Sequence, residues 1–127
     1  MNNTLFVGID ISKRSNVATF MNCEGKVVGR LAFSNNGSGA DRLVAKILSY
    51  YEKGDFEAIR IGMENTSVYS KNLVWFLYEH EALNEHKLSI IPLNAIMVAN
   101  YKKSFLDMDK DDITDSFAIA DFIRIRP

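Results

Sequence analysis

The feature that most restricts the fold is an apolar segment near the N-terminus. Residues 4–10 read TLFVGID and are apolar at almost every position before Asp10. A strand with one face in water alternates apolar and polar residues, whereas a nearly continuous apolar run is typical of a strand covered on both faces. We therefore expect residues 4–10 to form a central strand of a sheet that helices flank.

The remaining elements follow from periodicity and from turn residues. Residues 16–22 and 26–33 are predicted to pair as a hairpin, with Gly25 supplying the positive φ angle of the turn. The other predicted segments are helices at about 39–52, 67–80 and 112–124, strands at 56–63 and 88–91 (the latter closed by Pro92), and a helical or irregular stretch at 94–105. Three strands followed by α/β units is the order of the ribonuclease H-like fold, an α/β fold with a mixed five-stranded sheet.

Length and composition exclude several classes of protein. The 127 residues correspond to one domain, and the net charge of −1 gives no overall attraction to nucleic acid or membrane. One cysteine, Cys23, excludes an internal disulfide framework and a cysteine-rich zinc site. His80 and His86 lie in a polar stretch and are expected at the surface. No segment reads as a membrane span or a signal peptide, so a cytoplasmic setting is expected.

The C-terminal sequence SFAIADFIRIRP stays apolar and helical to its last residues. Because domains more often end in a polar tail, we expect residues 1–127 to be one domain of a longer protein.

Carboxylates follow the two strands that are predicted to be innermost. Asp10 and Glu64 each stand at the C-terminal end of such a strand, where open α/β sheets bind their ligands. Asp112 and Asp115 are three residues apart at a predicted helix start and share a face. Four converging carboxylates repel one another unless a cation neutralises them. Oxygen ligands without nitrogen or sulfur favour Mg²⁺ or Mn²⁺, so the pattern indicates a two-metal phosphodiester site.

Each acid also has a simpler interpretation. Asp10 is also compatible with a loop cap, and Glu64 with an exposed acid that ends a strand. Asp112 is also compatible with a helix N-cap, and Asp115 with a first-turn acid that the helix dipole favours. The metal hypothesis depends on the agreement in position among the four acids.

Four sequence blocks resemble a known family. FVGIDISK, IGMENTSVY, IIPLNA and KDDITDSFAIA occur in the order seen in the N-terminal, RuvC-like domain of the DEDD transposases of bacterial insertion sequences. The resemblance covers nearly the whole chain. It places the family's four acids on Asp10, Glu64, Asp112 and Asp115. A one-residue slip would choose Asp111 instead of Asp112, but that slip breaks the three-residue spacing to Asp115.

Two positions depart from the family pattern. Ser67 follows Thr66 where the family commonly has glycine, and Ser116 follows Asp115 where it commonly has alanine. Neither departure replaces a carboxylate.

The resemblance implies a metal-dependent transposase that acts on DNA in insertion-sequence transposition. It also implies a guide RNA, a homo-oligomer in the full-length protein, and a C-terminal domain that supplies a nucleophilic serine. The fragment alone is therefore expected to be inactive in recombination. Basic residues near the acids are candidates for nucleic-acid contacts, namely Lys13, Arg14, Lys102, Lys103 and Lys110. Tyr69 and Trp75 are expected to pack within the fold and not to stack on bases.

Other functions are compatible with the same predicted core. A sugar- or acetate-kinase-like ATPase shares the fold, but its phosphate loop needs small residues after the aspartate, and here Ile11, Ser12 and Lys13 follow Asp10. A RuvC-like structure-specific nuclease would carry the same four acids. A non-catalytic binding or dimerisation module is the third alternative.

Overall fold

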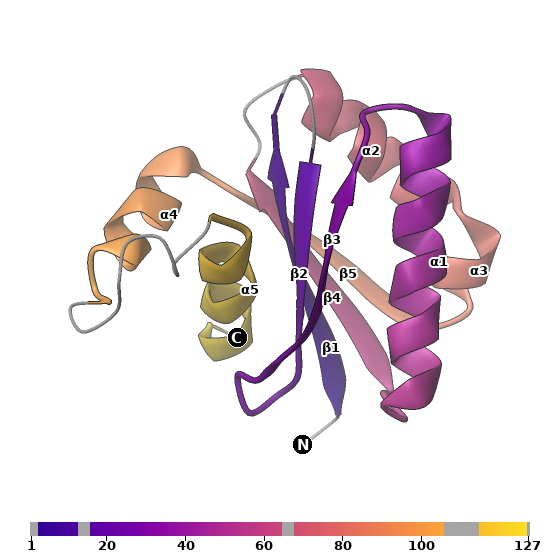
Figure 1. The fold of residues 1–127 in the computed structure, drawn as a ribbon, viewed down its shortest axis with the longest axis horizontal. Helices are drawn as coiled ribbons and strands as arrows, with labels where there is room; N and C mark the ends of the chain where they lie inside the picture. Colours follow the sequence, from indigo (N-terminus) through magenta and orange to yellow (C-terminus); the bar gives the residue numbers. More distant parts are fainter. Residues whose placement is uncertain (1–2, 13–15, 65–67, 106–114, 127) are drawn as a thin grey trace.

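The computed structural model describes residues 3–12, 16–64, 68–105 and 115–126. Five strands form one sheet in the order β3-β2-β1-β4-β5, and β1 (Thr4–Ile11) occupies its centre (Figure 1). β2 pairs with β1 and β3 in antiparallel fashion, whereas β4 and β5 are parallel to β1. The other strands are β2 (Asn16–Met21), β3 (Val27–Phe33), β4 (Ala58–Glu64) and β5 (Lys87–Leu93). The predicted mixed five-stranded sheet and the central place of the first strand are confirmed.

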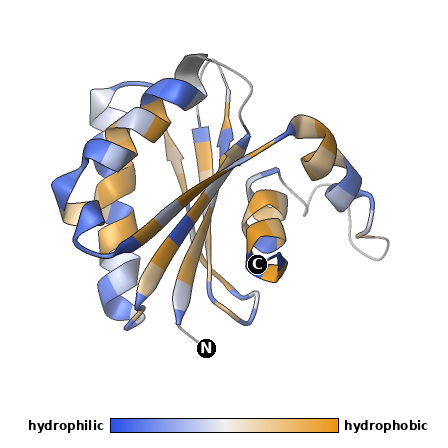
Figure 2. Ribbon diagram, turned by 180° about the vertical axis from the view of Figure 1, so that it is seen from behind, coloured by the Kyte–Doolittle hydropathy of each residue, from blue (hydrophilic) through white to orange (hydrophobic). Residues whose placement is uncertain are grey.

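Helices cover both faces of the sheet. α1 (Gly37–Lys53), α2 (Val68–Glu79) and α3 (Glu81–Asn84) lie on one face, and α4 (Ala95–Lys102) and α5 (Asp115–Ile125) lie on the other (Figure 1). The strands must therefore be apolar on both sides, which explains the continuous apolar run of β1. α5 is itself largely hydrophobic, as its colouring in Figure 2 shows.

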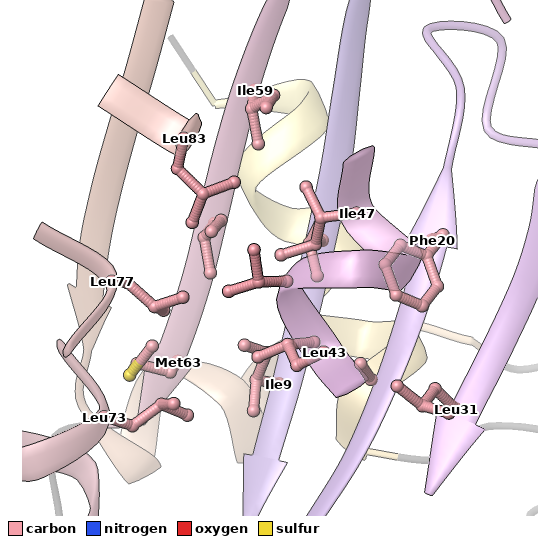
Figure 3. Packing of buried hydrophobic residues seen from close by; sticks show 14 of the residues in the cluster. Ile9, Phe20, Leu31, Leu43, Ile47, Ile59, Met63, Leu73, Leu77 and Leu83 are labelled. Atoms are coloured by element: carbon pink, nitrogen blue, oxygen red, sulfur yellow. The ribbon is translucent and has the colours of Figure 1, made fainter. Parts of the chain in front are cut away.

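The side chains of β1 alternate between two hydrophobic clusters. Leu5, Val7 and Ile9 join the larger cluster, which includes residues of α1, α2 and α3 (Figure 3). Phe6 joins the smaller cluster, which consists mainly of residues from α4 and α5. Because successive side chains of a strand point to opposite faces, Gly8 and Asp10 lie on the same face as Phe6.

Glycines allow α5 to lie directly on the sheet. Gly8 of β1 pairs in register with Gly62 of β4. A Cβ atom on Gly8 would lie 2.2 Å from the backbone oxygen of Ser116 and 2.4 Å from the backbone nitrogen of Ala120. Since no real Cβ approaches backbone so closely, the helix can occupy this position only above a glycine.

Most predicted elements are confirmed, including the Gly25 turn, whose φ angle is +86°. Strand β5 is longer than predicted, because Pro92 lies inside it instead of closing it. β5 is an edge strand, and there the missing N–H of proline leaves no ladder partner unsatisfied.

One side-chain prediction was wrong, and another is refined. Trp75 is 67% exposed on α2 and does not pack in the core. His80 and His86 lie at the surface but are half-buried there, because the ring of His86 packs against Tyr51 with centroids 4.1 Å apart and His80 lies against Phe76. The side chain of Tyr69 lies outside the described part of the structure. Across the described ranges, no helix has both the length and the apolarity that crossing a membrane requires.

Candidate active site

Asp10 and Glu64 lie together at the carboxyl end of the sheet. β1 and β4 are adjacent and parallel, and their register pairs Ile9 with Met63 just before the two acids. Glu64 is the last residue of β4, and Asp10 precedes the last residue of β1. Asp10 shares a face with Gly8, and Glu64 shares a face with Gly62, so both carboxylates lie on the face that α5 covers. Both side chains are half-buried.

α5 brings a third carboxylate to this end. Asp115 is the first residue of the helix, and the next residue, Ser116, lies over Gly8 of β1. The hydroxyl groups of Ser116 and Thr19 are 2.8 Å apart in a buried hydrogen bond that joins α5 to β2. Ser116, a departure from the family pattern, therefore fastens the helix that carries Asp115.

The charges of these acids interact. Burial raises the pKa of Asp10 above its usual value, and the nearby Asp115 carboxylate raises it further. Burial also raises the pKa of Glu64, and the negative charges of Asp115 and Asp10 add to the effect. The ammonium group of Lys102 opposes the rise in pKa at both acids. Three carboxylates thus lie close enough to repel one another, and one lysine only partly offsets their charge.

Lys102, at the end of α4, is a basic residue that contacts this site. Its Nζ atom lies 2.6 Å from Oδ1 of Asp115, and both side chains are more than one-third exposed. The pair is therefore open to solvent, so a divalent cation can compete with Lys102 for the Asp115 carboxylate, and a phosphate group can compete with Asp115 for the Lys102 ammonium group. Of the other predicted basic residues, Lys103 is exposed just beyond α4. Lys13, Arg14 and Lys110 lie outside the described residues.

The donors suit a hard divalent cation, although the described residues do not complete a metal site. Within the described ranges, no group of three or more His, Cys, Asp or Glu side chains could hold a metal ion. Asp112, the fourth acid of the predicted set, and its alternative Asp111 lie outside those ranges. Carboxylate oxygens are the ligands that Mg²⁺ and Mn²⁺ prefer, and Asp10, Glu64 and Asp115 bring negative charges near one another at this end of the sheet. By their donor chemistry the residues present therefore fit a hard divalent cation, although Asp10, Glu64 and Asp115 alone do not complete its site.

A second polar cluster fixes the helices around the site, and the sequence interpretation missed it. Asp121 on α5 is only 7% exposed and accepts a hydrogen bond of 2.5 Å from the Tyr101 hydroxyl group on α4. Arg124 donates to the other oxygen of Asp121 from Nε at 2.9 Å and from an Nη atom at 2.7 Å. Burial and the hydrogen bond to Asp121 raise the pKa of Tyr101. The sequence feature that could have revealed this cluster is an acid, Asp121, within an otherwise apolar helix, with an arginine three residues later.

Comparisons with known proteins agree with this geometry. A model of the DEDD transposase family of the IS110 type, described as a transposase, matches residues 7–127. No curated protein matches the sequence. Among solved structures, the fold is similar to Thermus thermophilus RuvC in complex with a Holliday junction substrate, with a TM-score of 0.54 and 11% sequence identity. That match covers 94% of this chain and 91% of the RuvC chain.

The RuvC likeness confirms the predicted ribonuclease H-like fold, and the family match extends over nearly the whole sequence. The family match does not favour the kinase-like alternative. The chain belongs to the DEDD transposase family.

Proposed function

We propose that this chain is the metal-dependent catalytic domain of its transposase and that Asp10, Glu64, Asp112 and Asp115 form the active site. The observation that carries the proposal is the convergence of three carboxylates from β1, β4 and α5 at one end of the sheet. Burial raises the pKa values of Asp10 and Glu64, and repulsion from the neighbouring carboxylates adds to the rise; a bound cation would relieve that repulsion. Asp112 is assigned from the motif, three residues before Asp115.

The four carboxylates would hold Mg²⁺ or Mn²⁺. Such ions, when bound, polarise a phosphodiester and stabilise the attacking and leaving oxygens of its cleavage. The protein's own contribution is to hold the carboxylates on three elements whose relative positions are fixed by packing. Lys102 partly neutralises Asp115, and it is suitably placed to contact a phosphate group of the DNA.

The proposed partners extend beyond this site. We assign backbone contacts to Lys13, Arg14, Lys102, Lys103 and Lys110, because lysine and arginine beside an acidic metal site attract the phosphates that the acids alone would repel. A guide RNA and a homo-oligomeric full-length protein follow from the family resemblance. In this proposal residues 1–127 are one domain, and the nucleophilic serine belongs to a further domain. The purified chain alone should therefore not recombine DNA, and strand exchange by it would contradict this division of roles.

Metal binding tests the site directly. Titration calorimetry with Mn²⁺ and with Mg²⁺ should detect binding to the unaltered chain, and Asp10→Asn and Asp112→Asn should each abolish it. Asp41→Asn is the matched control, because Asp41 is an exposed acid of α1 on the opposite face of the sheet. If Asp10→Asn and Asp112→Asn bind as tightly as the unaltered chain, the assignment is wrong.

Melting temperatures of the same purified chain distinguish the proposed metal site from the kinase-like alternative. A metal site that binds Mn²⁺ raises the melting temperature when Mn²⁺ is added alone, because the ion binds only the folded state. A nucleotide-binding domain would instead be stabilised by ATP.

A further inference from the structure

An uncharged pocket lies at the same end of the sheet as the carboxylates. Its volume is about 250 Å³. Four asparagine side chains line it together with two phenylalanines, and these residues are Asn16, Asn35, Asn36, Asn72, Phe33 and Phe76. They come from the start of β2, the end of β3, the connection to α1, and α2. The function proposed above does not use them.

The end of β1 separates this pocket from the acidic site. Asn16 pairs in register with Ile11, the residue that follows Asp10. Asp10 lies on the face covered by α5, whereas the pocket lies between the sheet and the helices α1 and α2 on the other face. A nucleic-acid strand that crosses this end of the sheet would therefore meet both. Lys71, exposed on α2 beside Asn72, is a candidate contact for its phosphates.

Hydrogen bonds made by asparagine side chains hold one wall of the pocket in place. The amide of Asn16 donates to Asn35, whose own amide donates to the backbone oxygen of Ser12. Asn36 accepts a hydrogen bond from the backbone nitrogen of Gly39 at 2.8 Å and thereby caps α1. A wall fixed in this way loses little conformational freedom when a ligand binds.

Asn72 differs from the other three asparagines. It is exposed on α2, and its amide has no hydrogen-bond partner among the residues that the structure describes. Its donor and its acceptor are therefore both available to a ligand.

The lining suits a nucleobase better than an ion. It contains no charged side chain, so it offers nothing that selects a phosphate or a metal. An asparagine amide can donate to and accept from the edge of a base, and the half-buried ring of Phe76 can pack on its face; Phe33 is buried in the core beneath. The volume is just below the roughly 300–1,000 Å³ of pockets for drug-sized ligands, which suits one base and not a whole nucleotide.

We propose that this pocket holds one unpaired base of single-stranded DNA bound at the carboxylates, with Asn72 as its hydrogen-bonding residue. The proposal rests on the function proposed above, because it requires DNA to cross this end of the sheet.

Fluorescence anisotropy with two probes tests the proposal. One probe is labelled oligodeoxyadenylate of about 12 nucleotides, and the other has the same length but carries abasic units throughout. The measured quantity is the ratio of the two dissociation constants, abasic over adenylate, for the unaltered chain and for Asn72→Leu, Asn72→Ala and Asn100→Leu. Asn100 is the matched control, because it is an exposed asparagine of α4 on the opposite face.

The ratio should be about fivefold or more for the unaltered chain and for Asn100→Leu, and it should fall toward one for both Asn72 variants. Circular dichroism will verify that the variants are folded. A ratio near one for the unaltered chain, or a ratio that both Asn72 variants leave unchanged, would show that the pocket does not bind a base. The proposed DNA contacts would be unaffected by that result. If neither probe binds the unaltered chain, both the pocket and the proposed DNA contacts are wrong.

Discussion

Asp10 destabilises the folded chain when no cation is bound, and this destabilisation depends on pH. The unfolded chain releases the proton of Asp10 near the usual pKa of 3.8, whereas burial and Asp115 raise the pKa in the folded state. At pH values between these two pKa values, the folded state binds more protons than the unfolded state, so the free energy of unfolding falls as the pH rises through this window. Asp10→Asn removes the charge, and we expect it to raise the melting temperature by a few degrees at neutral pH in the presence of EDTA.

The gain from Asp10→Asn should shrink as the pH is lowered toward about 4, because Asp10 in the folded chain then becomes protonated and its charge no longer opposes folding. Thermal melts followed by circular dichroism between about pH 4 and pH 7 check this. Asp41→Asn, at an exposed position, should give no comparable gain. An equal gain from the two variants would contradict the mutual repulsion of the site's carboxylates.

Tyr101 joins α4 to α5 through a buried acid. Tyr101→Phe removes the 2.5 Å hydrogen bond to Asp121 and leaves one buried oxygen without this donor. We expect a loss of about 1–3 kcal/mol in the free energy of unfolding, measured by urea denaturation. Tyr78→Phe is the control, because Tyr78 is 50% exposed and should change stability by less than about 0.5 kcal/mol. Equal effects of the two substitutions would mean that the Tyr101 hydroxyl group contributes no stability of its own.

The individual residues of the site differed in how far the sequence could predict them. Asp10 and Glu64 each follow an apolar run, so their place at adjacent strand ends was predictable from local pattern and strand order. The contact of Lys102 with Asp115 was not, because it depends on how α4 and α5 pack across the sheet. Asp121 was not identified either, since an acid in a mostly apolar helix gives no local sign that Tyr101 will meet it.

Among the elements, α5 has a tightly restricted position, because it lies directly on Gly8 of β1. In Gly8→Ala the new methyl group would meet backbone atoms of Ser116 and Ala120, which cannot rotate away as a side chain can. The helix must therefore shift, and we expect a loss of about 1–3 kcal/mol in the free energy of unfolding, together with weaker Mn²⁺ binding because Asp115 moves with the helix. Chemical denaturation and titration calorimetry measure the two effects.

Gly37→Ala is the matched control for Gly8→Ala. Gly37 begins α1, and a Cβ atom there would meet nothing within 4 Å. Alanine favours helix, so this substitution should be neutral or slightly stabilising. If Gly8→Ala behaves like Gly37→Ala, the close contact between α5 and β1 does not restrict the helix.

The elements themselves were predictable where periodicity was strong, as in the hairpin around Gly25 and in α1. Errors arose where tertiary position outweighs local preference. Pro92 reads as the end of a strand, yet an edge strand accommodates it. Trp75 reads as a core residue by its size, yet the inward face of α2 is already filled by Leu73 and Leu77, which leaves Trp75 on the outside.

In the whole molecule, one sheet is shared by two hydrophobic clusters. Ile119 on α5 is fully buried in the smaller cluster, whereas α2, which carries Trp75, contributes Leu73 and Leu77 to the larger one. The strands between the clusters contribute side chains to both, so neither layer should unfold without the other.

Ile119→Ala should therefore lower the free energy of unfolding by about 2–5 kcal/mol for the entire chain. The fluorescence of Trp75, on the opposite side of the sheet, and far-ultraviolet circular dichroism should report the same shifted midpoint. If the fluorescence transition stays at its original denaturant concentration while the circular dichroism midpoint falls, the two layers unfold independently, and the sheet does not couple them.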